Sequence, residues 1–187
     1  MPIELDDILA VEIPQFILLE AEKNAQFMQS KRQSPKYRLL TKEHNKIGFV
    51  GHWAVEQVLD RWRIPYETTR EEKYSGGDLY DLKIDESRID VKTSMLGWYN
   101  PKYYYNKDFY VLKAQMDDEK SEYVDYYIFV HLERDWSYAR IFGVASKQQI
   151  LDCPIIGPCE TPMRLVYENY RIFSRELKPL AKYIFHV

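Results

Sequence analysis

The sequence has few cysteines, and this scarcity already narrows the class of protein. Only Cys153 and Cys159 occur in 187 residues, and they flank the short segment PIIGP. A disulfide framework or a structural zinc site normally draws on more ligands of this kind, so neither is expected here. The same scarcity is typical of a reducing, cytoplasmic setting, which we predict for this chain.

Long apolar runs and targeting signals are also missing. No run is long enough to span a bilayer, and the first twenty residues are acidic where a secretory signal would be basic. The chain carries no internal repeat and no low-complexity tract, and its length suits one hydrophobic core. We therefore expect a single globular domain with no membrane partner.

The sequence has no excess of positive charge. Its 26 basic and 29 acidic residues give a net charge of −3, which argues mildly against a dedicated nucleic-acid binder. Basic residues do gather in two segments, which are candidates for contacts to backbone phosphates but are equally typical of solvated surface. The first comprises Lys31, Arg32, Lys36, Arg38, Lys42 and Lys46, and the second comprises Arg164, Arg171, Arg175, Lys178 and Lys182.

The most informative stretch is residues 76–94, GGDLYDLKIDESRIDVKTS. Two short apolar strands flank a polar turn, which predicts an antiparallel hairpin over residues 79–94. If the turn lies at residues 86–87, Ile84 pairs with Ile89 and Asp81 pairs with Lys92. Residues two apart share a face, so Asp81, Asp90 and Lys92 are expected on one side of the hairpin. The apolar residues Leu82, Ile84, Ile89 and Val91 are expected on the other side.

Two alternatives to this arrangement stay open. A one-residue bulge would reverse the faces and place Asp78 in the cluster instead of Asp81. Alternating charged and apolar residues also describe any half-exposed strand, in which an Asp–Lys pair is purely structural.

The segment before the hairpin has the pattern of a helix. Apolar residues recur at helical spacing over residues 47–62, IGFVGHWAVEQVLDRW. His52 and Glu56 lie four residues apart, on one face of that helix. They are candidate ligands, and the alternative is the solvated stripe of an amphipathic helix.

The hairpin and the helix together resemble the PD-(D/E)xK phosphodiesterase superfamily, which has the restriction-endonuclease-like fold. In that family an Asp opens one strand and an (Asp/Glu)-x-Lys triplet lies on the next. Asp78 or Asp81 matches the first element, and Asp90 with Lys92 matches the second. The proline of the family motif is absent here. The resemblance covers roughly residues 47–145.

The family's helix before the hairpin usually supplies a Glu to the metal site. His52 stands where that Glu is expected, and nucleases of the RecB exonuclease type use a His from this region. Glu56, one turn later, is the alternative. The resemblance implies that at least one of His52 and Glu56 contacts the metal ion directly.

The resemblance implies metal-dependent hydrolysis of DNA, most simply by an endonuclease. Mg²⁺, with Mn²⁺ as a substitute, prefers oxygen ligands, which Asp90, Asp81 or Asp78 and the carbonyl of Val91 would supply. Lys92 would orient or deprotonate the attacking water, or stabilise charge on the phosphate. RNA is an alternative substrate, and a homodimer or higher oligomer would pair two sites for double-strand cutting.

The expected fold is α/β, a restriction-endonuclease-like mixed β-sheet flanked by α-helices in a single domain. Residues 1–46 form a helical N-terminal extension, 47–145 the catalytic core and 146–187 the C-terminal completion. The patterns predict helices over 14–31 and 42–62 and a short one from 146 to 151. They predict strands over 64–70, 109–116, 123–132 and 138–144, besides the hairpin.

Several residues near the hairpin are secondary candidates. The segment 98–110, WYNPKYYYNKDFY, interleaves aromatic and basic residues as a base-stacking surface would, although it also suits a loop packed over the sheet. Gln115 is a candidate to reach the site from a neighbouring strand, and Thr93 and Ser94 are candidates to contact a phosphate. Two rival functions are a catalytically inactive nucleic-acid-binding module and a structural subunit of a larger assembly.

Overall fold

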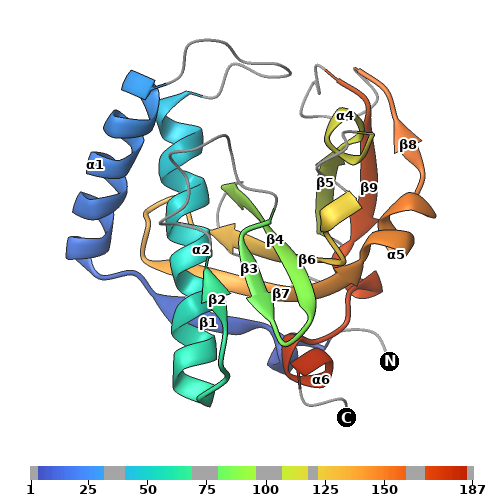
Figure 1. The fold of residues 1–187 in the computed structure, drawn as a ribbon, viewed down its shortest axis with the longest axis horizontal. Coiled ribbons are helices and arrows are strands. Elements are labelled where there is room, and N and C mark those ends of the chain that lie inside the picture. Colours follow the sequence, from blue (N-terminus) through green and yellow to red (C-terminus); the bar gives the residue numbers. More distant parts are fainter. Residues whose placement is uncertain are drawn as a thin grey trace.

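A curled six-stranded mixed sheet forms the centre of the protein, with helices packed beside it (Figure 1). This computed structural model describes residues 4–31, 41–68, 80–95, 107–117, 122–158 and 167–184. The strand order is β1-β7-β6-β4-β3-β2, and β4 and β6 form the parallel pair. The strands are β1 (Leu9–Glu12), β2 (Glu67–Thr68), β3 (Leu82–Ile84), β4 (Ser87–Met95), β6 (Tyr126–Leu132) and β7 (Tyr138–Ser146).

Two long helices cover one face of this sheet. They are α1 (Gln15–Lys31) and α2 (Lys42–Trp62), and α2 packs against α1 and β4. The Thr41 hydroxyl caps α2 by accepting from the His44 backbone N–H, and Arg63 ends the helix in the left-handed conformation (φ 56°). The apolar stripe of α2, including Val55 and Leu59, is buried in the core that it shares with β3, β4 and β6.

A second, three-stranded sheet lies on the opposite side, in the order β5-β9-β8 (Figure 1). Its strands are β5 (Asp108–Leu112), β8 (Ile155–Ile156) and β9 (Asn169–Phe173), accompanied by α4 (Lys113–Met116) and α5 (Lys147–Leu151). Short helical turns η1 (Leu5–Asp7), η3 (Ser174–Glu176) and α6 (Leu180–Ile184) complete the described elements. A second apolar core, with Phe109, Phe129 and Phe142 at its centre, joins the two sheets.

Most of the elements expected from the sequence are present. The helices expected over 14–31 and 42–62 correspond to α1 and α2, and Ser146 caps α5 by accepting from the Gln149 backbone N–H. The strand predicted over 109–116 is wrong in its second half, because Lys113–Met116 forms the helical turn α4. β1 and β8 were not predicted, since four-residue and two-residue strands carry too little periodicity to be recognised.

The hairpin register differs from the predicted one by two residues. Leu82 pairs with Ile89 and Ile84 with Ser87, so the turn lies at Asp85 and Glu86. Asp85 adopts a left-handed φ of 49°, a conformation that Asp tolerates better than most residues. Ser87 does not adopt this conformation. Because side chains alternate with a period of two, this shift leaves every residue on its predicted face.

None of the described helices has both the length and the apolar character that crossing a membrane requires.

Candidate active site

Strand β4 presents Asp90 and Lys92 on the same face, as its alternation predicts. Their side chains form an ion pair, with Lys92 Nζ 2.7 Å from Asp90 Oδ2. The parallel register places Asp90 beside Tyr127 and Lys92 beside Phe129, both of which belong to the core between the two sheets. The charged face of the hairpin is therefore directed toward the second sheet, whereas Leu82, Ile84 and Ile89 are buried against α2.

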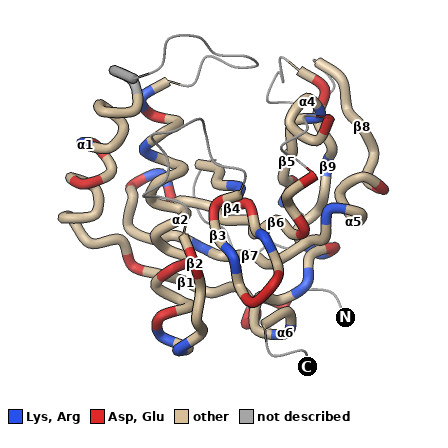
Figure 2. Tube along the Cα trace, viewed as in Figure 1, with Lys and Arg blue, Asp and Glu red and all other residues tan. Residues whose placement is uncertain are grey.

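The Asp90 carboxyl lies in a poorly solvated position. Its side chain retains 26% of its exposure, but the Oδ2 atom is inaccessible to solvent. Burial raises the pKa of Asp90, the positive charge of Lys92 opposes that rise, and the negative charge of Asp81 adds to it. A carboxylate held close to a second carboxylate in a desolvated setting is stabilised by any further cation. Figure 2 shows acidic and basic residues side by side along this hairpin.

Asp81 is held next to Asp90 by the backbone of β4. Its Oδ2 accepts a hydrogen bond from the Val91 N–H at 2.8 Å, and its own N–H donates to the Ile89 carbonyl at 2.9 Å. Asp81 lies just before the first residue of β3. Its side chain therefore accepts the hydrogen bond of the Val91 N–H that a main-chain carbonyl would otherwise accept. This bond leaves the other carboxylate oxygen of Asp81 available for a ligand.

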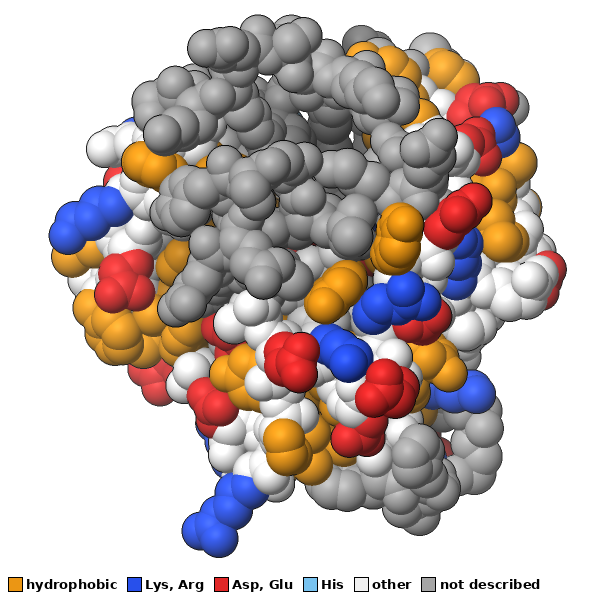
Figure 3. Space-filling view, in the orientation of Figure 1, with side chains coloured by type: hydrophobic (Ala, Val, Ile, Leu, Met, Phe, Trp, Pro, Cys, Tyr) orange, Lys and Arg blue, Asp and Glu red, His pale blue; other side chains and the backbone are white. Residues whose placement is uncertain are grey.

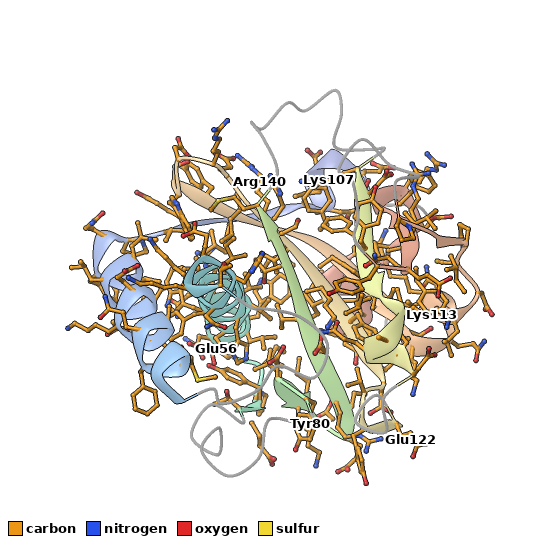
Figure 4. All side chains as sticks on the ribbon, turned by 90° about the horizontal axis from the view of Figure 1, so that it is seen from above. Glu56, Tyr80, Lys107, Lys113, Glu122 and Arg140 are labelled. Carbon is orange, nitrogen blue, oxygen red and sulfur yellow. The ribbon has the colours of Figure 1, made fainter. Side chains whose placement is uncertain are left out.

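Helix α2 contributes His52 and Glu56 from beneath the sheet. Both are buried, with 3% and 8% exposure, and His52 Nε2 lies 4.0 Å from Glu56 Oε1. The charge of His52 acts on Asp90 and lowers its pKa, so the helix and the hairpin meet at this carboxyl. Glu56 lies on the part of α2 that approaches the hairpin (Figure 4). The predicted alternative, a solvated stripe, does not hold for these two residues.

A glycine sets the spacing between α2 and β4. A methyl group at Gly51 would fall 1.9 Å from Thr93 Oγ1 and 2.7 Å from Thr93 Cβ. The helix backbone therefore lies directly on the strand, one residue before His52. Thr93 has its side chain on this inner side, so its expected phosphate contact is replaced by packing against the helix.

Gln115 reaches the site from α4, as proposed from the sequence, although it lies on a helical turn and not on a strand. Its Oε1 accepts a hydrogen bond from Lys92 Nζ at 3.1 Å. Lys92 Nζ also lies 5.7 Å from the centroid of the Tyr127 ring. The ammonium group is thus oriented by a carboxylate, an amide oxygen and an aromatic face.

We expect Gln115→Leu to lower the rate of any Lys92-dependent reaction about 3- to 10-fold. The net contribution of a typical hydrogen bond is about 0.5–1.5 kcal/mol, and Asp90 remains as a partner of Lys92. Gln115 is exposed, so the unfolding midpoint should not change. Steady-state kinetics would show the loss in kcat with KM retained. Gln115→Glu keeps an acceptor oxygen and should restore most of the rate, and an equal loss in both variants would contradict the positioning role.

The donor set suits a hard divalent cation. Asp81 and Asp90 supply carboxylate oxygens, and the Val91 carbonyl directly follows Asp90 in the sequence. Burial chiefly raises the pKa of Asp90 and the Asp81 charge adds to the rise, so a cation at this position would stabilise the ionised carboxylates. Over the described ranges, however, no three His, Cys, Asp or Glu side chains converge as closely as metal ligands do. Asp78, the alternative to Asp81, lies outside the described residues.

The remaining candidates are only partly described. The Tyr-rich segment is described from Lys107 onward, and Arg32, Lys36, Arg38 and Arg164 lie outside the described residues. In the two basic segments, Lys42 and Lys46 pair with Glu22, and Arg171 pairs with Asp108 at 2.7 Å. On the described part of the face in Figure 3, basic and acidic side chains alternate without forming a large patch of one sign.

Comparison of the chain with protein-family models, with curated proteins and with solved structures finds no match. The interpretation of the site therefore depends on the geometry of its residues.

Sequence reasoning missed two residues near this face of the sheet. They are Tyr127, whose pKa is raised by burial and by the Asp90 charge, and His131, which contacts Lys107 of the candidate segment 98–110. Tyr127 and His131 lie inside an apolar strand, where no local pattern distinguishes them from core residues. Only the parallel pairing of β6 with β4 reveals that they share a face with Asp90 and Lys92.

Proposed function

We propose that this protein is a metal-dependent nuclease of the PD-(D/E)xK type, acting on DNA. The observation that carries the proposal is the desolvated Asp90 carboxyl, paired with Lys92 at 2.7 Å and adjacent to Asp81. A helix precedes the hairpin, an Asp stands before one strand and an Asp-x-Lys triplet lies on the next, which supports the family's arrangement. The mixed sheet flanked by helices is compatible with the restriction-endonuclease-like fold, which belongs to the same proposal.

Each residue has a role in this proposal. Asp90, Asp81 and the Val91 carbonyl would hold Mg²⁺ or Mn²⁺, and His52 or Glu56 would complete the set from α2. The bound ion would supply Lewis acidity and a more acidic water. Lys92 would place its positive charge against the scissile phosphate, while Gln115 and Tyr127 hold its ammonium group in position.

Metal binding is expected to raise the thermal unfolding midpoint, because a ligand that binds only the folded state stabilises it by mass action. At a concentration of about 100 Kd the gain is about 2.7 kcal/mol. Differential scanning fluorimetry with Mg²⁺ and with Mn²⁺, each against EDTA, would measure it. Asp90→Ala should abolish the rise, whereas Asp152→Ala, which removes an exposed carboxylate at the end of α5, should retain it.

The activity test uses linear, circular and single-stranded DNA and RNA with either metal. Cleavage by the wild type that EDTA and the Asp90→Ala/Lys92→Ala variant both abolish would establish the nuclease and its substrate class. Absence of both cleavage and a metal-dependent shift would contradict the proposal and favour an inactive binding module. A metal-dependent shift without cleavage would point to a missing partner or a narrow target.

A further inference from the structure

Helix α1 has apolar residues on two opposite faces. Ile17, Ala21 and Ala25 are buried on the face that packs against α2. On the other side, Phe16 and Leu19 are 58% and 56% exposed, and Figure 3 shows hydrophobic side chains gathered over the first turns of this helix. A surface helix normally keeps its apolar residues on one face, so this second group is typical of a surface that a partner covers.

The exposed side of α1 forms one continuous face. Phe16, Glu20, Lys23 and Phe27 follow one another at intervals of four, three and four residues, and Leu19 lies beside Phe16 and Lys23. All five are exposed. Phe27 also has an interaction within the chain, and 38% of it remains accessible. This outer face of α1 has an aromatic ring at each end and two opposite charges between them, over about 17 Å of helix.

The two charges in the middle of the outer face are not used inside the described chain. Glu22, on the side of the helix, pairs with Lys42 and Lys46 of α2. Neither Glu20 nor Lys23 has a side-chain hydrogen bond or ion pair among the residues that the structure describes. These two charges are therefore available to a partner.

The order of the charges makes the outer face complementary to itself. In two antiparallel copies of α1, related by a two-fold axis between residues 21 and 22, Glu20 is level with Lys23 of the second copy. The symmetry repeats this contact, so two pairs of opposite charge form. The same register places Phe16 level with Phe27 of the second copy. A parallel pair of helices would instead set each charge against its own like, which is repulsive.

We propose that the outer face of α1 binds the same face of a second copy of this chain, in an antiparallel two-fold dimer. Phe16, Leu19 and Phe27 lose contact with water on association, and the pairs between Glu20 and Lys23 set the direction and the register. A lipid surface fits this face less well, because anionic headgroups repel the acid at its centre. The inference does not depend on the proposed nuclease function, since it uses neither the hairpin nor a metal.

The dimer is expected to be weak. One helix face is smaller than the surface of about 800 Å² that each partner of a standard interface buries, so we expect a Kd of about 10–100 µM. Sedimentation equilibrium from about 5 to about 500 µM protein, in EDTA and without nucleic acid, would measure it. The average mass should rise from the 22.5 kDa of one chain toward twice that value.

Loss of the apolar contacts should weaken association. Phe16→Ser/Leu19→Ser is expected to raise the Kd at least about 10-fold, because a few buried apolar and aromatic side chains carry most of the energy of an interface. Both side chains are more than half exposed, so the fold should persist, which melting curves would check. The matched control is Leu151→Ser, which removes a 39% exposed side chain of α5 and should leave the Kd within about 2-fold.

Charge reversal tests the register. Glu20→Lys alone and Lys23→Glu alone each place like charges at both symmetry-related contacts, so each should raise the Kd about 10-fold at low salt. A mixture of the two variants restores opposite charges at both contacts, and a heterodimer should form with a Kd within about 3-fold of the wild type. Salt at about 0.5 M should remove the effect of charge reversal but not that of Phe16→Ser/Leu19→Ser.

Three results would overturn the proposal. The first is a protein that stays monomeric up to about 500 µM. The second is a dimer whose Kd is unchanged in Phe16→Ser/Leu19→Ser, since it would use another face. The third is a mixture of Glu20→Lys and Lys23→Glu that forms no heterodimer. If the protein is monomeric and binds anionic vesicles only with Phe16 and Leu19 intact, the face belongs to a lipid surface and the dimer is refuted. None of these outcomes depends on whether the protein cleaves DNA.

Discussion

Lys92→Met is expected to reduce the rate of metal-dependent DNA cleavage by about two to four orders of magnitude, the range for loss of a charge or proton donor acting at the reacting phosphate. Among the described residues, the Lys92 ammonium forms the ion pair with Asp90, and burial raises the pKa of this carboxyl. Methionine keeps the unbranched shape and most of the length of the side chain and removes its charge. Single-turnover cleavage of a labelled duplex, with enzyme in excess, would isolate this loss from binding.

The matched control is Lys83→Met, on the neighbouring strand of the same hairpin. Lys83 forms an ion pair with Glu86 at 3.5 Å, and Glu86 is almost fully exposed, so the change should leave cleavage within about 2-fold and stability within about 0.5 kcal/mol. Equal losses in the two variants would show that the hairpin's net charge matters and that Lys92 has no specific role. Retained cleavage in Lys92→Met would overturn the assignment of the triplet.

Gly51→Ala is expected to lower the free energy of unfolding by about 2–3 kcal/mol, at the upper end for overpacking in a core. Its methyl group would overlap Thr93, whose branched side chain is short and fixed on a strand, so α2 and β4 must separate. Urea denaturation followed by circular dichroism would measure the loss. Because α2 carries His52 and Glu56, the same separation should weaken metal binding.

Gly48→Ala, one turn earlier in the same helix, provides the opposite expectation. Nothing lies within 4 Å of a methyl group at Gly48, which is exposed, so the change should stabilise the protein by about 0.5–1 kcal/mol through helix propensity. In the double variant Gly51→Ala/Thr93→Ala, stability should recover in part, since Thr93 Oγ1 and Cγ2 are removed but Cβ remains. A loss of similar size at Gly48 and Gly51 would mean that the Thr93 contact is not the cause.

In the hairpin, the local sequence pattern predicted the faces of the strands but not their register. Its strands, its apolar face and the shared facing of Asp90 and Lys92 follow from the alternation of side chains between the two faces of a strand. A shift of the pairing by two residues leaves this alternation unchanged. The register itself did not follow, because the choice between turns at residues 85–86 and 86–87 depends on backbone conformations that neighbouring side chains barely distinguish. The left-handed φ of Asp85 decided it.

The residue types of the candidate site were predictable from the sequence, and its surroundings were less so. Carboxylates, a lysine and a helix with His52 and Glu56 are visible as residue types at a spacing, and the structure brings Asp81, Asp90, Lys92 and His52 within electrostatic reach of one another. The sequence did not predict that the second sheet, β5-β9-β8, would lie beside this site. Gln115 was proposed as a contact, but Tyr127 and His131 come from strand β6, which is separated from the hairpin by tens of residues.

The amino-acid sequence by itself determined the longer elements and the polarity of their faces, because helical and strand periodicity are local properties of neighbouring residues. It also determined the Asp-x-Lys triplet, whose two side chains share a face wherever the strand lies. The tertiary structure alone decided which residues meet across strands. The parallel pairing of β4 with β6 places His131 beside Ser94, and the pairing of β5 with β9 anchors Lys107 over that pair. Such contacts depend on chain crossovers and on the total burial of two cores, which no short window of sequence contains.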